Sequence, residues 1–198
     1  NGASVVCPAT GKALSTAIAP AIVERLIARM HETGRVMEIY TDYEYAVERD
    51  SDRARRHAAL LQLPYKPRSF SALTDSIVRA QWLVPHSERE AVMAEPHDGL
   101  TVCPSLAPLM PDTSFVNMTA EGVDKGSALR AVASVYGIPL ERVMMIGDSQ
   151  NDLPALRIAG VAVAMGNSEQ ITMDTAHVTV GHVDEGGLLE ALAMAISA

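Results

Sequence analysis

The hexapeptide GDSQND at residues 147–152 carries the strongest chemical signal in the chain. It follows the apolar run 143–146, which is typical of a buried parallel strand that stops at a turn. Asp148 therefore falls at the carboxyl edge of a predicted sheet, where open α/β folds bind their ligands. A carboxylate at this edge can hold Mg²⁺ through oxygen, and Asp152, at the start of the next helix, can bind the waters of the ion.

A purely structural interpretation accounts for part of this motif. Ser149 can cap the following helix, with Asp152 completing a capping box and interacting favourably with the helix dipole. This alternative leaves Asp148 and Asn151 unexplained, so the hexapeptide as a whole favours a functional site.

Lys125, in the segment GVDKG at residues 122–126, is the second candidate. A lysine that opens a helix can reach a phosphoryl group and neutralise charge during its transfer. Taken alone, such a lysine is usually a solvated surface residue, and its charge is mildly unfavourable near a helix N-terminus. Its position ahead of the Asp148 turn is what makes it a candidate for the same site.

The elements around these residues alternate between strand and helix. We expect helices at 125–136, 151–159, from 168 and at 187–196, and strands at 143–146, 161–165 and 177–180. Strand, helix and strand joined by short links are typical of βαβ units and a parallel sheet.

Residues 4–118 have a different pattern, which predicts a separate α+β unit. We expect helices at 18–31, 52–63 and 87–94, two strands within 35–47 around a turn near residue 42, and strands at 80–84, 100–104 and 114–118. The aromatic residues Tyr40, Tyr43, Tyr45 and Trp82 are expected to take part in packing rather than in a ligand site.

The bulk composition restricts the partners of the protein. A formal net charge of −8 argues against nucleic acid, because phosphate backbones are held by clustered Lys and Arg. No apolar run approaches the length of about 20 residues needed to cross a bilayer, so we expect no membrane partner. The two cysteines form no paired motif and no leader segment is visible, from which we expect a cytoplasmic protein.

The stretch 122–168 closely resembles the C-terminal part of Cof-type phosphatases of the haloacid dehalogenase superfamily. In that family the lysine of the KG pair and the GDxxND turn are catalytic motifs, and the AMGN segment follows the next strand. More weakly, residues 1–3 resemble the point where the core of the family passes into its cap, and residues 38–41 resemble a cap strand. The resemblance implies an α/β fold: a Rossmann-like parallel-sheet core at 1–3 and 119–198, with an inserted α+β cap at 4–118 that selects the substrate.

The resemblance also implies a function, that of a Mg²⁺-dependent phosphomonoester hydrolase. Its substrate would be a small phosphorylated metabolite, such as a sugar phosphate, and its reaction would pass through an aspartyl-phosphate. Lys125 and Asp148 would be catalytic, Lys125 binding the phosphoryl group and Asp148 ligating Mg²⁺ directly. Asn151 would bind the phosphate or position Lys125, and Asp152 would support the ion directly or through water.

The family's nucleophile lies in a DxDGT motif, which this sequence lacks. Residues 50–52 have the DxD spacing but follow no buried strand and precede Arg-Ala, which predicts a charged turn, and residues 98–99 also predict a turn. We therefore expect that an N-terminal core segment with two strands is absent, through cloning, proteolysis or gene truncation, and that this chain alone is inactive. The exposed sheet would favour self-association.

Two other classes of protein remain open from the sequence. One is a non-catalytic binding or regulatory module that keeps the fold without its nucleophile. The other is a receiver-like signalling domain, which the cap-sized segment before Lys125 disfavours.

Overall fold

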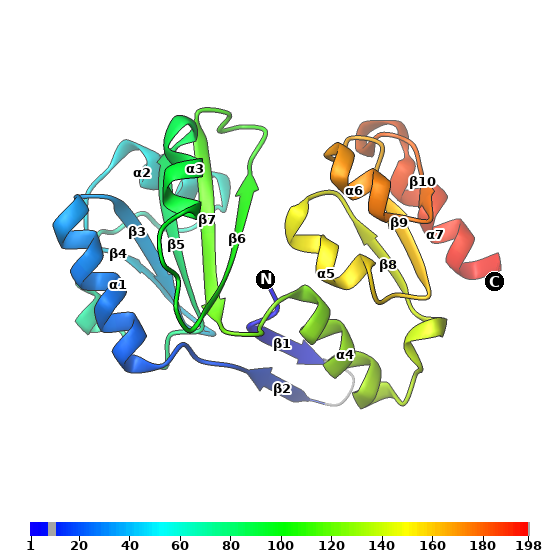
Figure 1. The fold of residues 1–198 in the computed structure, drawn as a ribbon, viewed down its shortest axis with the longest axis horizontal. Helices are drawn as coiled ribbons and strands as arrows, with labels where there is room; N and C mark the ends of the chain where they lie inside the picture. The colour runs from blue at the N-terminus through cyan, green and yellow to red at the C-terminus, as the bar shows by residue number, and fades with distance from the viewer. Residues whose placement is uncertain (8–10, 198) are drawn as a thin grey trace. The chain divides into compact units, whose positions relative to one another are not determined.

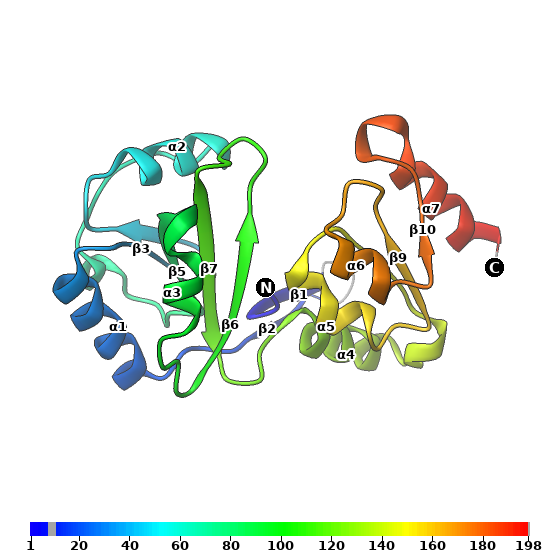
Figure 2. The same ribbon diagram turned by 45° about the horizontal axis from the view of Figure 1, so that its top comes forward.

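The computed structural model describes residues 1–7 and 11–197, which form parts of two compact units (Figures 1 and 2). The first unit comprises Asn1–Cys7 and Val123–Ala198, and the second comprises Pro8–Gly122. Across the described ranges, no helix combines the length and the apolar character that a membrane crossing requires.

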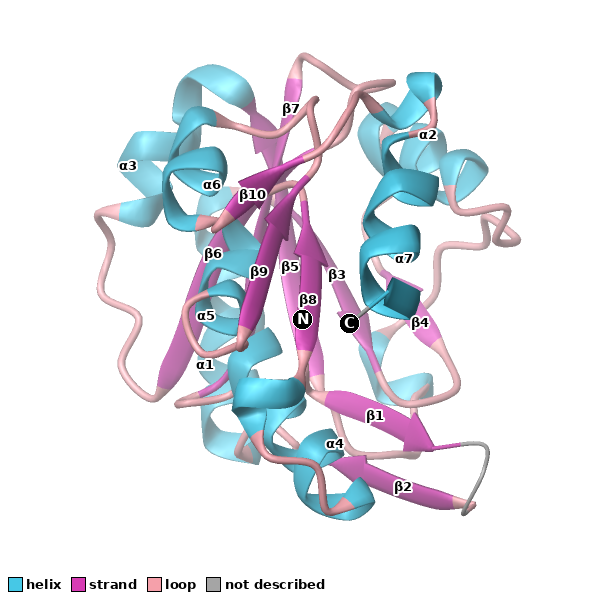
Figure 3. Ribbon diagram, turned by 90° about the vertical axis from the view of Figure 1, so that its right-hand side faces the viewer, coloured by secondary structure: helices cyan, strands magenta, loops and turns pink. Residues whose placement is uncertain are grey.

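The first unit is built on a parallel sheet with the strand order β10-β9-β8 (Figure 3). Its elements are β1 (Ser4–Cys7), α4 (Lys125–Tyr136), η3 (Leu140–Arg142), β8 (Met144–Gly147), η4 (Gln150–Asp152), α5 (Leu153–Leu156), β9 (Val161–Ala164), α6 (Gln170–Thr175), β10 (Val178–Thr179), η5 (Val183–Glu185) and α7 (Gly187–Ser197).

Side chains of the parallel sheet alternate between two faces, which are covered along β9 but only partly along β8, where residues 144–146 are half-buried. Val163 packs with Val180 and with Ala191 of α7, which closes one face. The neighbouring residues Ala162 and Ala164 are fully buried on the other face, where α5 and α6 contact the strands. The predicted βαβ arrangement of this part of the chain is confirmed.

The second unit contains an antiparallel five-stranded sheet with the order β4-β3-β5-β7-β6. Its elements are β2 (Lys12–Ser15), α1 (Pro20–Thr33), β3 (Val36–Tyr40), β4 (Tyr45–Val47), α2 (Asp52–Leu60), η1 (Phe70–Ala72), β5 (Arg79–Pro85), η2 (His86–Glu88), α3 (Arg89–Met93), β6 (Leu100–Leu106) and β7 (Thr113–Ala120).

Alternation along the strands gives this sheet two different faces. Trp82 and Met118 belong to a large apolar core with α1 and α3, visible in front of the sheet in Figure 1. Leu83 and Phe115, one residue out of step, pack with Ala54 of α2 on the opposite face. On the α2 face, Glu38 of β3 also contacts His57 of α2 and Gln81 of β5.

The fold class predicted from the sequence is confirmed, with parallel and antiparallel sheets in separate units. Two details differ from the expected elements. The short strands β1 and β2 were not predicted, and the helix expected at 151–159 is a 3₁₀ turn followed by the four-residue helix α5. The second unit, Pro8–Gly122, begins and ends four residues later than the predicted range 4–118, because β1 belongs to the first unit and β7 continues to Ala120. The roles of cap and core stay a prediction.

Candidate functional site

The turn after β8 folds tightly back on the end of its own strand. Gly147 is the last residue of β8, and a Cβ atom placed on it would lie 2.5 Å from the Cβ of Asp152. Only glycine therefore allows the Asp152 side chain to lie against the strand end. As a consequence, the carboxylate of Asp152 points back to the turn that precedes it.

Asp152 is buried, with 3% of its surface exposed, and it accepts hydrogen bonds on both carboxylate oxygens. Its Oδ2 accepts the backbone N–H groups of Asp148, at 3.0 Å, and Ser149, at 3.3 Å. The capping box predicted as the structural alternative is therefore present. Asp152 Oδ1 accepts a further bond from Lys125 Nζ at 2.5 Å, which a capping role alone does not explain.

Lys125 is the first residue of α4, as the sequence predicts. Asp124 caps this helix in a capping box with Ser127, whose N–H donates to Asp124 Oδ1 at 2.7 Å. A Cβ atom on Gly126 would lie 2.7 Å from the carbonyl oxygen of Pro154, so the start of α4 approaches the start of α5 closely. This approach brings the Lys125 ammonium to the turn after β8.

Asn151 connects the lysine to the rest of the site. Its Oδ1 accepts hydrogen bonds from Lys125 Nζ at 3.3 Å and from Ser149 Oγ at 2.7 Å. Its Nδ2 donates to Asn1 Oδ1 at 3.0 Å. The sequence predicts no role for Asn1 in the site, and no spacing pattern would reveal a partner 150 positions away.

Asp148 is exposed at the carboxyl end of β8, and its side chain is the open carboxylate of the site. Partial burial of its carboxyl group, followed by the negative charge of Asp152, raises its pKa, and the charge of Lys125 offsets part of this effect. The negative charges of these two carboxylates repel each other, and a bound hard cation would reduce this repulsion. Their oxygen donors fit Mg²⁺, although the described residues offer no cluster of three or more His, Cys, Asp or Glu side chains.

The structure thus brings together Lys125, Asn151 and Asp152 by direct contact, with Asp148 beside them. An ammonium group and an amide next to two carboxylates can bind a phosphoryl group on one side and a cation on the other. The catalytic, binding and metal roles of these four residues stay predictions.

The other acidic motifs lie outside this site. The expectation that no buried strand precedes residues 50–52 was wrong, because β4 ends at Val47 with Ala46 and Val47 buried. Ser51, between the two acids of the DxD spacing, caps α2 by accepting the N–H of Ala54. Gly99, in the predicted turn at 98–99, has a positive φ of 75°. Both motifs lie in the second unit.

A family model described as haloacid dehalogenase-like hydrolase matches residues 1–192 of the chain. Among curated proteins, the chain is 38% identical over 72 residues to a 5-amino-6-(5-phospho-D-ribitylamino)uracil phosphatase of Bacillus subtilis, covering 36% of this chain and 29% of the relative. It is 37% identical over 82 residues to a phosphoglycolate phosphatase of Methanothermobacter thermautotrophicus, covering 41% and 37%. The matched regions therefore span well under half of these relatives.

Solved structures share the fold over nearly the whole chain. A sugar phosphatase of haloacid dehalogenase subclass IIB matches with a TM-score of 0.83 at 22% identity, covering 98% of this chain and 73% of the other. A phosphatase of the same superfamily from Bacteroides thetaiotaomicron matches with a TM-score of 0.80 at 23% identity, covering 100% and 72%. At these identities the likeness shows the fold alone.

Proposed function

The chain belongs to the haloacid dehalogenase-like hydrolases, and we propose that it is part of a Mg²⁺-dependent phosphatase for a small phosphorylated metabolite such as a sugar phosphate. The observation that carries this proposal is the contact of the Lys125 ammonium with Asp152 and Asn151 at the carboxyl end of β8. We further propose that the protein is cytoplasmic and uses neither nucleic acid nor a membrane as a partner. The acidic net charge of −8 supports the first of these exclusions.

The ammonium of Lys125 is held by Asp152 in a fixed direction, and it would bind the phosphoryl oxygens and neutralise the charge that develops during transfer. Asn151 would support it, since its Oδ1 accepts from Lys125 and its Nδ2 is a donor. Both oxygens of Asp152 already accept bonds, so its support of the ion would pass through water. Asp148 would ligate Mg²⁺ directly, and the ion would supply Lewis-acid stabilisation of the phosphoryl group.

Formation of an aspartyl-phosphate needs an attacking carboxylate besides these residues. In the family that the sequence resembles, this carboxylate comes from a DxDGT segment, which the 198 residues do not contain. An aspartate of such a segment would attack phosphorus, the alcohol of the substrate would leave, and water would then cleave the acyl phosphate to release inorganic phosphate.

The test is Mg²⁺-dependent hydrolysis of an aryl phosphate by two proteins, this chain and a longer chain that includes a DxDGT segment, each with its Asp148→Asn variant. We expect turnover by the longer chain, its loss in Asp148→Asn, and no turnover by the 198-residue chain above its variant. If the longer chain folds but hydrolyses none of a panel of sugar phosphates, the proposal is contradicted.

A non-catalytic binding or regulatory module is the second candidate, favoured by the lack of a DxDGT motif in the sequence. It predicts that Mg²⁺ and phosphate bind, with the same dependence on Asp148 and Lys125, while the longer chain shows no turnover above its Asp148→Asn variant. Binding without hydrolysis in that chain therefore selects the module over the phosphatase.

A further inference from the structure

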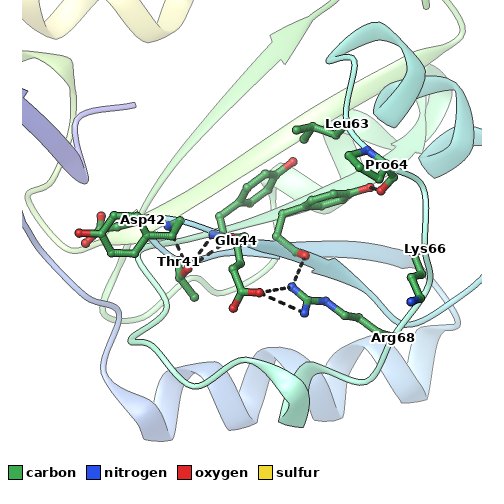
Figure 4. Close-up of a pocket in the computed structure, with 10 residues that line it drawn as sticks. Thr41, Asp42, Glu44, Leu63, Pro64, Lys66 and Arg68 are labelled. Atoms are coloured by element: carbon green, nitrogen blue, oxygen red, sulfur yellow. Dashed lines mark hydrogen bonds and ion pairs between the residues drawn. The ribbon is translucent and has the colours of Figure 1, made fainter.

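A pocket of about 560 Å³ lies in the second unit, and none of the candidate phosphoryl-site residues lines it (Figure 4). It lies between the β3–β4 hairpin, residues 40–45, and the loop 63–68 that follows α2. Its volume falls within the range of about 300 to 1,000 Å³ typical of small-molecule sites. We propose that this pocket binds a planar aromatic ring that carries an anionic group, as a nucleoside monophosphate does.

The apolar part of the pocket is a pair of tyrosines set by strand register. Tyr40 and Tyr45 lie opposite each other on β3 and β4, and their rings stack with centroids 5.8 Å apart. The guanidinium of Arg79, opposite Tyr40 on the other side of β3, lies 3.8 Å from the centroid of the Tyr40 ring. Arg79 does not line the pocket but holds the Tyr40 ring, so the tyrosine pair is what the pocket offers a planar ring for stacking.

A buried polar cluster holds this aromatic pair in place from within the unit. The hydroxyl of Tyr40 donates to Glu38 Oε2 at 2.6 Å, and Glu38 is completely buried. His57 Nδ1 and Gln81 Nε2 contact the same carboxylate at 2.9 and 3.2 Å. The Tyr40 ring is therefore fixed before any ligand arrives, which lowers the entropic cost of binding.

The loop wall of the pocket is tied to the hairpin by three contacts. Tyr45 OH donates to the carbonyl oxygen of Pro64 at 3.2 Å. Arg68 donates to Glu44 Oε1 at 3.2 Å and to the carbonyl oxygen of Tyr45 at 2.9 Å. Because Arg68 and Glu44 form an ion pair with each other, neither attracts a charged ligand strongly.

Lys66 is the charge that remains available. No described carboxylate lies within ion-pair distance of its ammonium, and Figure 4 shows it at the opposite end of the pocket from Asp42. A ligand with its ring on the tyrosines can therefore place an anionic group near Lys66 and away from Asp42. This polarity favours an aromatic anion over a neutral ring or a sugar phosphate.

Calorimetric titration of the full chain with adenosine 5′-monophosphate, adenosine and ribose 5-phosphate tests the proposal. We expect the monophosphate to bind most tightly. Lys66→Gln should weaken its binding about threefold to fivefold and leave adenosine nearly unchanged. Tyr45→Leu should weaken both the nucleotide and the nucleoside about fivefold or more. Arg157→Gln, which removes an exposed cation of the first unit, is the matched control and should change nothing.

Repeating the titration with Lys125→Gln distinguishes nucleotide binding in the pocket from nucleotide binding at the phosphoryl site. Pocket binding should persist there, and it does not depend on whether the protein is a phosphatase. Loss of binding in Lys125→Gln would assign the nucleotide to the phosphoryl site and overturn the proposal. Equal binding of ribose 5-phosphate, or equal effects of Lys66→Gln and Arg157→Gln, would overturn it as well. If Tyr45→Leu does not fold, the Lys66 comparison still decides.

Discussion

Replacement of Asp148 by asparagine removes one of two neighbouring carboxylates at the end of β8. Because the pKa of Asp148 is raised in the folded chain, the ionised form is less favourable there than in the unfolded chain. The stability that this raised pKa contributes is fully present below the pKa of the unfolded chain, near 4. It is lost as the pH rises through the pKa of the folded chain. Without metal, Asp148→Asn should therefore be the more stable protein at pH 7.

The expected gain is small because Asp148 is exposed and water screens its charge. Interactions of exposed charges are worth about 0.2 to 1 kcal/mol. For a chain of this size, 1 kcal/mol corresponds to a shift of the unfolding temperature of about 2 to 4 °C. We expect Asp148→Asn to melt about 1 to 3 °C higher than the original chain in EDTA at pH 7, and the difference to vanish below about pH 4.

Addition of Mg²⁺ should reverse this order. If the site binds Mg²⁺ with a Kd of about 1 mM, about 10 mM of the ion stabilises the original chain by about 1.4 kcal/mol, or about 3 to 6 °C. The variant has lost the direct ligand and should not respond. The assay is differential scanning calorimetry with and without the ion.

Glu185→Gln is the matched control, because it removes an exposed charge from the same unit at a distance in sequence from the site. It should respond to Mg²⁺ as the original chain does. Destabilisation of Asp148→Asn without metal, or stabilisation of the variant by Mg²⁺ as large as that of the original chain, would contradict this prediction.

Three further results are expected. Lys125→Met leaves the buried carboxylate of Asp152 without its cation and should lower the free energy of unfolding in urea by about 2 to 3 kcal/mol. The additional change Asp152→Asn should restore part of this loss. An unchanged stability of Lys125→Met would contradict the pairing. The pKa of Glu95 is lowered to about 2, chiefly by the hydrogen bond from Arg35. Glu95→Gln should therefore destabilise the chain by about 2 kcal/mol at pH 7, and this difference should disappear as the pH falls from 4.5 towards 2. A difference in thermal unfolding that does not depend on pH would count against the prediction. The helix α7 exposes apolar side chains such as Leu189, at 73%, so the chain should self-associate in light scattering and Leu189→Gln should reduce this, whereas a monodisperse monomer would contradict the expectation.

Much of the fold was readable because periodicity and capping residues agree over most elements. The helix α4 spans the predicted residues 125–136, between the Asp124 cap and Gly137 in the left-handed conformation. The prediction of a helix at 151–159 was wrong, because the chain first makes a 3₁₀ turn and α5 begins only at Leu153, next to Pro154. The strands β1 and β2 have four residues each, as β8 and β9 do, but they lack the continuous apolar run ending at a glycine by which β8 and β9 were predicted.

The candidate site was readable where its residues are near in sequence or share a motif. Residues 147–152 and Lys125 could be named in this way, but the hydrogen bond between Asn151 and Asn1 depends on how distant segments pack. The pocket of the second unit was not predicted, and its tyrosines were expected to take part in packing only. Trp82 does lie in the core, while Tyr40 and Tyr45 both stack on each other and line a pocket. The expectation of packing was wrong for Tyr43, which is 85% exposed. Strand register, which pairs Tyr40 with Tyr45 and with Arg79, decides this and has no local sequence signal.

Asp152 shows why the capping and the functional interpretations of the GDSQND turn are compatible. One carboxylate oxygen satisfies two backbone N–H groups of the turn, and the other holds the ammonium of Lys125. The turn that ends β8 and the group that would bind phosphate are therefore fixed by the same buried side chain. Replacement of Asp152 by alanine must alter fold and chemistry together, since it releases the turn as well as the lysine. Asp148, which is exposed and whose side chain accepts none of these bonds, is for that reason the position at which the chemistry can be removed while the turn stays intact.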